Sequence, residues 1–234
     1  MPRAIRLIPS LITLCNLWAG FLALYLVMQD KPLQASAFVA IALICDALDG
    51  NLARLLNATS AFGKELDSLS DIVSFVIAPA LLAVHTVTGW EILAAALLYT
   101  GAGAYRLARY NCHSDTDPHF KGLPTPAAAF TLVMMMVAYM SVPGTRQETT
   151  KTFCEVLLFF FAMLMASKIT YPKYTIVPFQ RWRLFLLLGL VVMTLGWIFV
   201  SLVFGLASAA LIFVTCSPLH YLLCCREKTP SSAA

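Results

Sequence analysis

Four aspartates lie close together in a polar stretch between two strongly apolar ones. The stretch reads Asp46-Ala-Leu-Asp49-Gly50-Asn-Leu-Ala53-Arg54 and, after eight residues, Gly63-Lys-Glu-Leu-Asp67-Ser-Leu-Ser-Asp71. The spacing of three between Asp46 and Asp49, and of four between Asp67 and Asp71, puts each pair on one face of a helix. Converging carboxylates are hard oxygen ligands that suit divalent cations, so the pattern predicts a site for Mg²⁺, Mn²⁺ or Ca²⁺.

A simpler interpretation is that these aspartates cap helices or pair with Arg54 and Lys64 in a polar loop. Like charges at helical spacing repel each other, and carboxylates near a bilayer are costly, so folding alone would not favour four of them here. Small residues accompany the aspartates where two helices would come close or a ligand would approach the backbone: Gly50, Ala53 and Gly63. The metal site is therefore the preferred interpretation.

The composition is that of an integral membrane protein. Of the 234 residues, 60% are hydrophobic and 12% charged, and the mean hydropathy is +0.80; a soluble domain carries about twice that charged fraction. We predict one all-α domain over residues 1–225, a polytopic membrane helix bundle, followed by a short disordered cytoplasmic tail over 226–234. The net charge of +4 is explained by membrane topology and anionic lipid headgroups, and nothing indicates a nucleic-acid partner.

About eight apolar segments are long enough to cross a bilayer. They cover residues 8–29, 33–56, 66–87, 90–111, 123–142, 151–169, 183–203 and 206–224, the first six forming a core and the last two an addition. Because only Phe204-Gly205 separates the last two, one long broken segment is the alternative.

Basic residues predict the orientation of these segments. With both termini in the cytoplasm, every one of the sixteen Lys and Arg residues except Lys31, Arg146 and Lys151 falls on the cytoplasmic side. We therefore expect a multi-pass protein of the cell inner or plasma membrane, with the aspartates at its cytoplasmic face.

Other polar residues gather at the same predicted ends. Arg106 and Arg109 lie one turn apart beside Asn111; an arginine fork suits carboxylate or phosphate, although snorkelling at the membrane boundary would also explain the pair. Thr13 and Asn16 share a face of the first segment, where a contact between helices is the alternative to a ligand contact. Further candidate lining residues are Lys121, Lys168 and Tyr171.

The aspartate stretch, read as D-x2-D-G-x2-A-R-x8-G-x3-D-x3-D, resembles the signature of the CDP-alcohol phosphotransferases with every position filled. Four further stretches resemble the CDP-diacylglycerol–serine O-phosphatidyltransferases within that family: T-L-x-N-x-x-x-G, R-L-A-R-Y-N, G-L-P-x-P-A-A-A and S-K-I-x-Y. Thr170 departs from the proline expected in the last one. The likeness covers about residues 8–175.

The resemblance implies a reaction and roles for the aspartates. CDP-diacylglycerol would donate its phosphatidyl group to the hydroxyl of L-serine, giving phosphatidylserine and CMP by direct displacement assisted by two Mg²⁺ or Mn²⁺ ions. Asp46, Asp49, Asp67 and Asp71 would ligate the metals, and Asp71 would also be the general base.

The resemblance further assigns the donor nucleotide to five positions: Asp46, Gly50, Ala53, Arg54 and Gly63. Arg106, Arg109 and Asn111 are the candidates for serine binding, with Arg109 preferred as the carboxylate partner. A homodimer is also implied, with small residues available for close helix contact: Ser74, Ala78, Ala80, Gly101 and Gly103. The alternatives are the same chemistry with glycerol 3-phosphate, inositol or inositol phosphate, and an ion-coupled transporter.

Overall fold

The computed structural model describes residues 7–112, 119–140 and 147–172 of the chain. Its elements are α1 (Ile8–Met28), α2 (Pro32–Leu55), α3 (Ala61–Asp71), the π-helical turn η2 (Ile72–Ile77), α4 (Ala78–Thr86), α5 (Trp90–Cys112), β1 (His119–Lys121), α6 (Thr125–Met140), α7 (Gln147–Ala166) and β2 (Thr170–Pro172). The last two predicted segments, 183–203 and 206–224, and the predicted tail over 226–234 lie outside the described residues.

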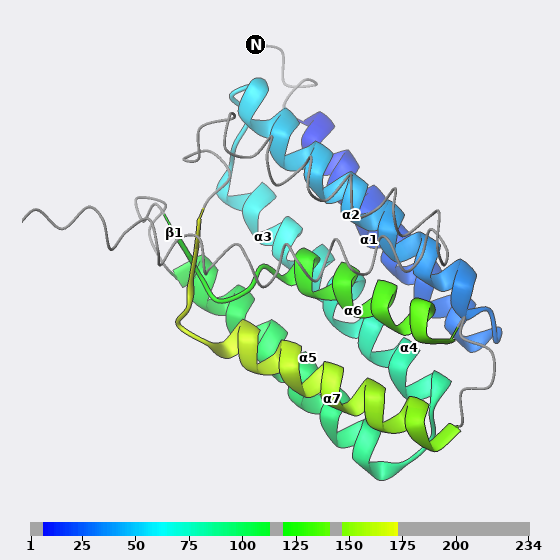
Figure 1. Cartoon of the computed structure of the whole chain (residues 1–234). Helices are drawn as coiled ribbons and strands as arrows, with labels where there is room; N and C mark the ends of the chain where they lie inside the picture. Colours follow the sequence, from blue (N-terminus) through cyan, green and yellow to red (C-terminus); the bar gives the residue numbers. More distant parts are fainter. Residues whose placement is uncertain (1–6, 113–118, 141–146, 173–234) are drawn as a thin grey trace, which may run out of the picture.

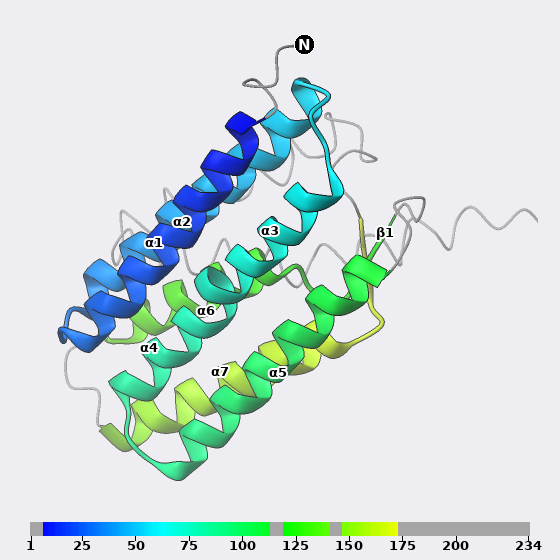
Figure 2. The ribbon, with the colours of Figure 1, turned by 180° about the vertical axis from the view of Figure 1, so that it is seen from behind.

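The helices form a bundle in which α3, η2 and α4 make one continuous central helix (Figures 1 and 2). The hairpin of α1 and α2 packs on one side of this helix, and α5 and α7 pack together on the other. α6 contacts α2, η2 and α7 and so closes the bundle between the two pairs. The all-α prediction holds for this region apart from β1 and β2, whose antiparallel pairing sets Lys121 opposite Thr170.

Four helices of the described region are long and apolar enough to cross a membrane: α1, α2, Ala61–Thr86 and Glu148–Ala166. α5, which carries Glu91, Arg106 and Arg109, is not among them, and α6 has only 16 residues. Large apolar side chains such as Trp18, Phe21 and Phe159 are exposed on the outside of the bundle, as lipid-facing residues would be. The chain is thus an integral membrane protein, while the count of about eight spans stays a prediction.

The central helix begins at Ala61, five residues before the predicted start at 66. Ser60 has an extended backbone, and its side chain accepts a hydrogen bond from the Gly63 N–H at 3.0 Å, which is the contact of an N-cap residue. The cap places Asp67 in the second turn of the helix and Asp71 in the third.

The π-helical turn η2 follows Asp71 directly. Pro79, just beyond it, has no N–H to donate to the carbonyl four residues earlier, which belongs to Phe75. The buried Tyr99 hydroxyl of α5 donates to that carbonyl at 3.0 Å. A break in the regular hydrogen bonding of the helix is therefore satisfied from a neighbouring helix, which also joins α5 to the central helix.

Small residues allow close helix contacts inside the chain. A Cβ on Gly20 of α1 would lie 2.8 Å from the Ser74 Cα, and one on Gly103 of α5 would lie 2.7 Å from Val76 Cγ2. Ala78 and Ala80 are buried in the core. Of the residues predicted to form a dimer contact, only Gly101 faces open space, with nothing within 4 Å in the described region. Most of the residues on which the predicted homodimer was based are therefore packed inside the chain itself, and the homodimer stays a prediction.

The Tyr99 contact gives a stability prediction. Tyr99→Phe should lower the free energy of unfolding by about 1–3 kcal/mol, because the Phe75 carbonyl is left buried without a donor. Thermal unfolding in detergent measures the loss, and Tyr25→Phe on the exposed face of α1 is the matched control. Equal melting temperatures for the two variants would contradict the assigned contact.

Candidate active site

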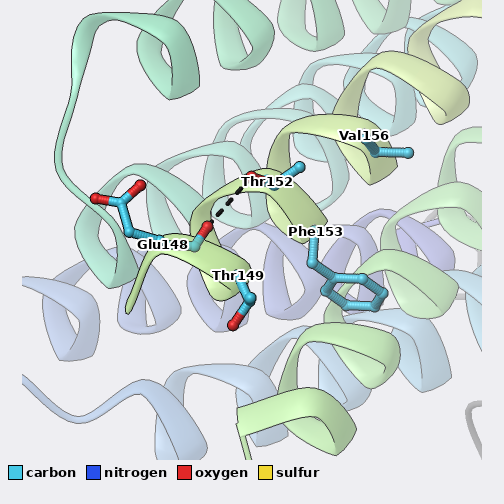
Figure 3. Close-up of a pocket in the computed structure, with 5 residues that line it drawn as sticks. All are labelled: Glu148, Thr149, Thr152, Phe153 and Val156. Atoms are coloured by element: carbon cyan, nitrogen blue, oxygen red, sulfur yellow. Dashed lines mark hydrogen bonds between the residues drawn. The ribbon is translucent and has the colours of Figure 1, made fainter. Parts of the chain in front are cut away.

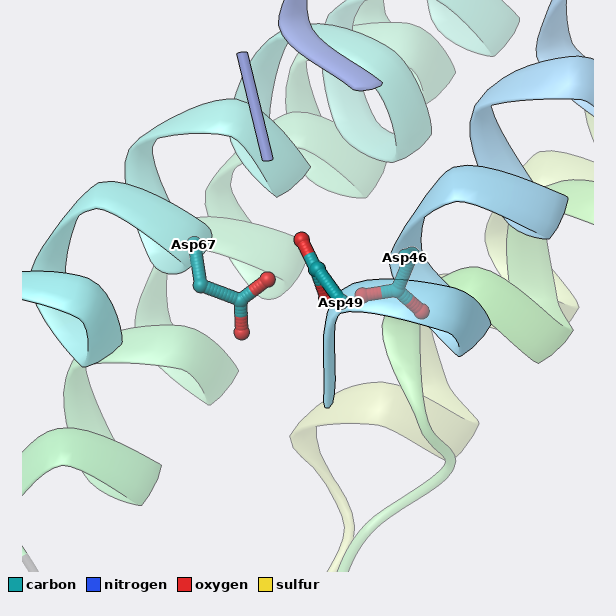
Figure 4. A group of neighbouring side chains, drawn as sticks. All are labelled: Asp46, Asp49 and Asp67. Atoms are coloured by element: carbon teal, nitrogen blue, oxygen red, sulfur yellow. The ribbon is translucent and has the colours of Figure 1, made fainter. Parts of the chain in front are cut away.

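Three carboxylates converge where α2 and α3 meet. Asp46 and Asp49 come from α2 and Asp67 from α3, and one oxygen of each lies within 4.8 Å of the others. Figure 4 shows Asp67 reaching across the gap between the helices toward the other two. The i, i+3 spacing on α2 therefore meets a third ligand from a separate helix, which is a geometry that can enclose a cation.

The residues fit a divalent metal ion. Asp49 is only 5% exposed, and its Oδ2 is buried with no hydrogen-bond partner among the described residues; the same holds for Oδ1 of Asp67. A buried anionic oxygen without a donor is costly unless a cation or a hydrogen bond satisfies it. Carboxylate oxygens are also the donors that Mg²⁺ and Mn²⁺ prefer.

The fourth aspartate stands apart from this group. Asp71 is 5% exposed, and the group of three carboxylates found in the described region does not include it. Its Oδ1 accepts a hydrogen bond from the Asn16 amide at 3.4 Å. The charges of Asp46 and Asp67 still act on Asp71, so Asp71 lies next to the group of three.

α1 is joined to the helix that carries Asp67 and Asp71 by two serine hydroxyls. Ser70 Oγ donates to the Thr13 carbonyl at 3.2 Å, and Ser74 Oγ donates to the Asn16 carbonyl at 3.0 Å. Thr13 is buried, and its side chain reaches Asp49. The predicted lining residues of α1, Thr13 and Asn16, are thus both beside the aspartates.

The two arginines of α5 lie in different surroundings. Arg106 is 6% exposed, donates to the Thr125 hydroxyl of α6, and acts electrostatically on Asp46 and Asp71. Arg109 donates instead to carbonyls at the end of α7, to Ser167 at 3.1 Å and to Met165 at 3.3 Å. Arg106 is therefore the arginine beside the acidic group, and Arg109 ties α5 to α7.

Asn111 forms hydrogen bonds with two side chains of α3. Its amide donates to Ser68 Oγ at 3.0 Å and to Glu65 Oε2 at 3.2 Å, which joins the end of α5 to the helix that carries Asp67. Sequence reasoning missed Ser68, Ser70, Ser74 and Thr125, whose hydroxyls bond to neighbouring helices around the site, and the N-cap Ser60. The hydroxyls that bond between helices cannot be recognised before the packing of the helices is known.

The predicted donor-binding residues lie around the end of α2. A Cβ on Gly50 would meet no described atom within 4 Å, so its surface is open to a ligand. Arg54 folds back on its own helix, with Nε donating to the Gly50 carbonyl at 3.0 Å and a terminal nitrogen donating to Asn51 Oδ1 at 3.1 Å. Ala53 is partly exposed nearby in α2, while Gly63 belongs to the N-cap of α3.

The remaining candidates lie at or beside the short strand pair. The backbones of Lys121 and Tyr171 belong to β1 and β2, and Lys168 is exposed between α7 and β2. Gly122, which follows β1, has φ +84°, and a Cβ there would lie 2.7 Å from an Arg109 nitrogen. Because Gly122 needs this positive φ and has no space for a side chain, the strand pair is held close to the end of α7.

A pocket at the other end of α7 is a separate feature. It is lined by Glu148, Thr149, Thr152, Phe153 and Val156 (Figure 3). These residues lie in the first half of α7, about 15–27 Å along the helix from the end that Arg109 contacts, at 1.5 Å per residue. The pocket therefore takes no part in the acidic site.

The fold and the site together define a class: an integral membrane protein with a group of carboxylates between its helices that could hold a cation. The family model described as CDP-alcohol phosphatidyltransferase matches residues 6–214. The chain belongs to the CDP-alcohol phosphatidyltransferase family, and it is a membrane transferase.

Several relatives carry the same name, CDP-diacylglycerol–serine O-phosphatidyltransferase. The one from Helicobacter pylori is 36% identical over 204 residues, which are 85% of this chain and 81% of that protein. The one from Bacillus subtilis is 34% identical over 174 residues, 71% of this chain and 90% of that protein. The one from Methanocaldococcus jannaschii is 34% identical over 172 residues, 74% of this chain and 77% of that protein.

Metal binding can be tested without turnover. Asp49→Asn and Asp67→Asn should each weaken Mn²⁺ binding by at least about tenfold, since each removes a charged oxygen from a group of three. Electron paramagnetic resonance of Mn²⁺ titrated into the purified protein measures this. Glu148→Gln, at the far end of α7, is the control. Wild-type affinity in both aspartate variants would contradict a metal site at this group.

Proposed function

We propose that this protein transfers the phosphatidyl group of CDP-diacylglycerol to the hydroxyl of L-serine, giving phosphatidylserine and CMP. The observation that carries the proposal is the group of three carboxylates with two unpartnered buried oxygens, in a chain of this family. The name shared by the relatives in three distant organisms supports serine as the acceptor.

Asp46, Asp49 and Asp67 would hold two Mg²⁺ or Mn²⁺ ions, with Ca²⁺ as a further occupant. When bound, these ions neutralise the pyrophosphate and the departing CMP. The open surface at Gly50 supports approach of the nucleotide to the end of α2, beside Ala53 and Arg54.

Asp71 takes the proton of the serine hydroxyl in this proposal. The hydroxyl oxygen attacks the lipid-side phosphorus of the pyrophosphate, the bond from that phosphorus to the oxygen of CMP breaks, and the proton passes to an Asp71 oxygen. Asp71 lies outside the group of three and accepts a hydrogen bond from Asn16, which supports its use as the base. This separates its role from that of the other aspartates.

Arg106 binds the serine carboxylate in this proposal, in place of Arg109. A guanidinium has five N–H donors, more than the Thr125 hydroxyl can accept, and the positive charge of Arg106 lies beside Asp71. The Arg109 guanidinium already donates hydrogen bonds to carbonyls at the end of α7. The acceptor would then meet its carboxylate partner and its base on neighbouring helices, facing the cytoplasm.

The function is tested with purified protein, CDP-diacylglycerol and a panel of alcohols. CMP release should depend on L-serine, stop in excess EDTA and return with Mg²⁺ or Mn²⁺. The panel includes glycerol 3-phosphate, inositol and inositol phosphate. Faster CMP release with any of these than with serine would refute serine as the acceptor, and full turnover in excess EDTA would refute metal assistance.

The arginine assignment is tested by two lysine variants. Arg106→Lys should raise the serine KM about ten- to a hundredfold, because a point charge replaces a bidentate fork. Arg109→Lys should lower the melting temperature by loosening α7 while leaving the serine KM nearly unchanged. Equal serine KM values in the two variants would rule out Arg106 as the carboxylate partner.

A further inference from the structure

Asn16 of α1 faces the aspartate that stands outside the group of three. Its side chain is 0% exposed, and its Nδ2 donates to Asp71 Oδ1. Its own Oδ1 is buried with no hydrogen-bond partner in the described part of the chain. A half-satisfied buried amide destabilises a membrane helix relative to an apolar residue of similar size. Packing alone therefore does not explain an asparagine at this position.

The surroundings of Asn16 hold it in place. The Ser74 hydroxyl donates to its backbone carbonyl at 3.0 Å. Gly20 has no side chain, so α1 can lie close against Ser74. One turn earlier, Ser70 donates to the Thr13 carbonyl. With its backbone fixed on both sides, Asn16 presents its amide to Asp71 in one defined position.

We propose that Asn16 is a positioning residue that holds one oxygen of Asp71 and thereby presents the other to the hydroxyl of the acceptor. The inference rests on the proposed function, in which Asp71 accepts that proton. Asp71 lies one turn beyond Asp67 and close to a cation-binding group, so a carboxylate free to rotate would be drawn toward the cation. The N–H of Asn16 opposes this rotation.

The unpartnered Oδ1 of Asn16 follows from this role. An ionised carboxylate only accepts hydrogen bonds, so the amide must turn its N–H toward Asp71 and its oxygen away. The separation of 3.4 Å is long, as is common for catalytic hydrogen bonds before a substrate is bound. An aspartate has the shape of asparagine but, when ionised, no proton to donate, which makes Asn16→Asp the most selective substitution.

The test compares Asn16→Ala and Asn16→Asp with Tyr99→Phe, which removes a buried hydrogen bond to the same central helix without touching Asn16 or Asp71. CMP release is measured with the alcohol that the wild-type protein uses best, so a different acceptor would refute the proposed function but leave this test valid.

Both Asn16 variants should lower kcat about ten- to a hundredfold. The KM for the acceptor should change less than about threefold, and Mn²⁺ binding should persist, since neither variant removes a carboxylate of the group. Tyr99→Phe should lower the melting temperature while keeping kcat within about twofold.

The exchange variant Asn16→Asp/Asp71→Asn separates a structural role from a positioning one. It restores an amide and a carboxylate to the same contact, so its melting temperature should recover relative to Asn16→Asp while CMP release stays lost. Three results would overturn the proposal: wild-type kcat in Asn16→Ala, an equal loss of kcat in Tyr99→Phe, or recovery of CMP release in the exchange variant.

Discussion

Mutual repulsion of carboxylates is the constraint on which the rest of this structure depends. Oxygens of Asp46, Asp49 and Asp67 lie within 4.8 Å of one another at the end of a membrane bundle, where water screens charge poorly. The helices must hold these groups together against that repulsion. Much of the polar bonding between helices is accordingly found at this end, and the buried Arg106 supplies a positive charge beside the group.

Holding two helices this close in lipid requires backbone contact, because apolar surface gains little from leaving lipid for protein. Gly20 provides that contact by giving Ser74 access to the surface of α1. The serine hydroxyls then bond to carbonyls of α1, and the Tyr99 hydroxyl of α5 bonds to the Phe75 carbonyl in η2. The central helix is thus hydrogen-bonded to both α1 and α5 directly beyond Asp71.

The sequence predicted the membrane class, the first four helices to within a few residues, and the meeting of the aspartates, because helical periodicity and hydropathy are local properties. It did not separate Asp71 from the other three, since spacing along one helix says nothing about a donor such as Asn16 on another. It also preferred Arg109 over Arg106. Both lie at one end of α5, and only the positions of α6 and α7 show that Arg106 bonds to Thr125 beside the acidic group while Arg109 bonds to carbonyls at the end of α7. The strands β1 and β2 are too short to leave a pattern.

A metal-assisted transfer to an alcohol needs carboxylates in two different roles, as cation ligands and as a base. Those that bind a cation give up their lone pairs to it, whereas a base must keep a lone pair free for the proton of the hydroxyl. Four identical side chains at helical spacing cannot make this distinction by themselves. We infer that a neutral amide on α1 makes it, because in the described region the hydrogen bond that the Asn16 side chain donates goes to Asp71. The first helix thus takes part in the site although it supplies no carboxylate.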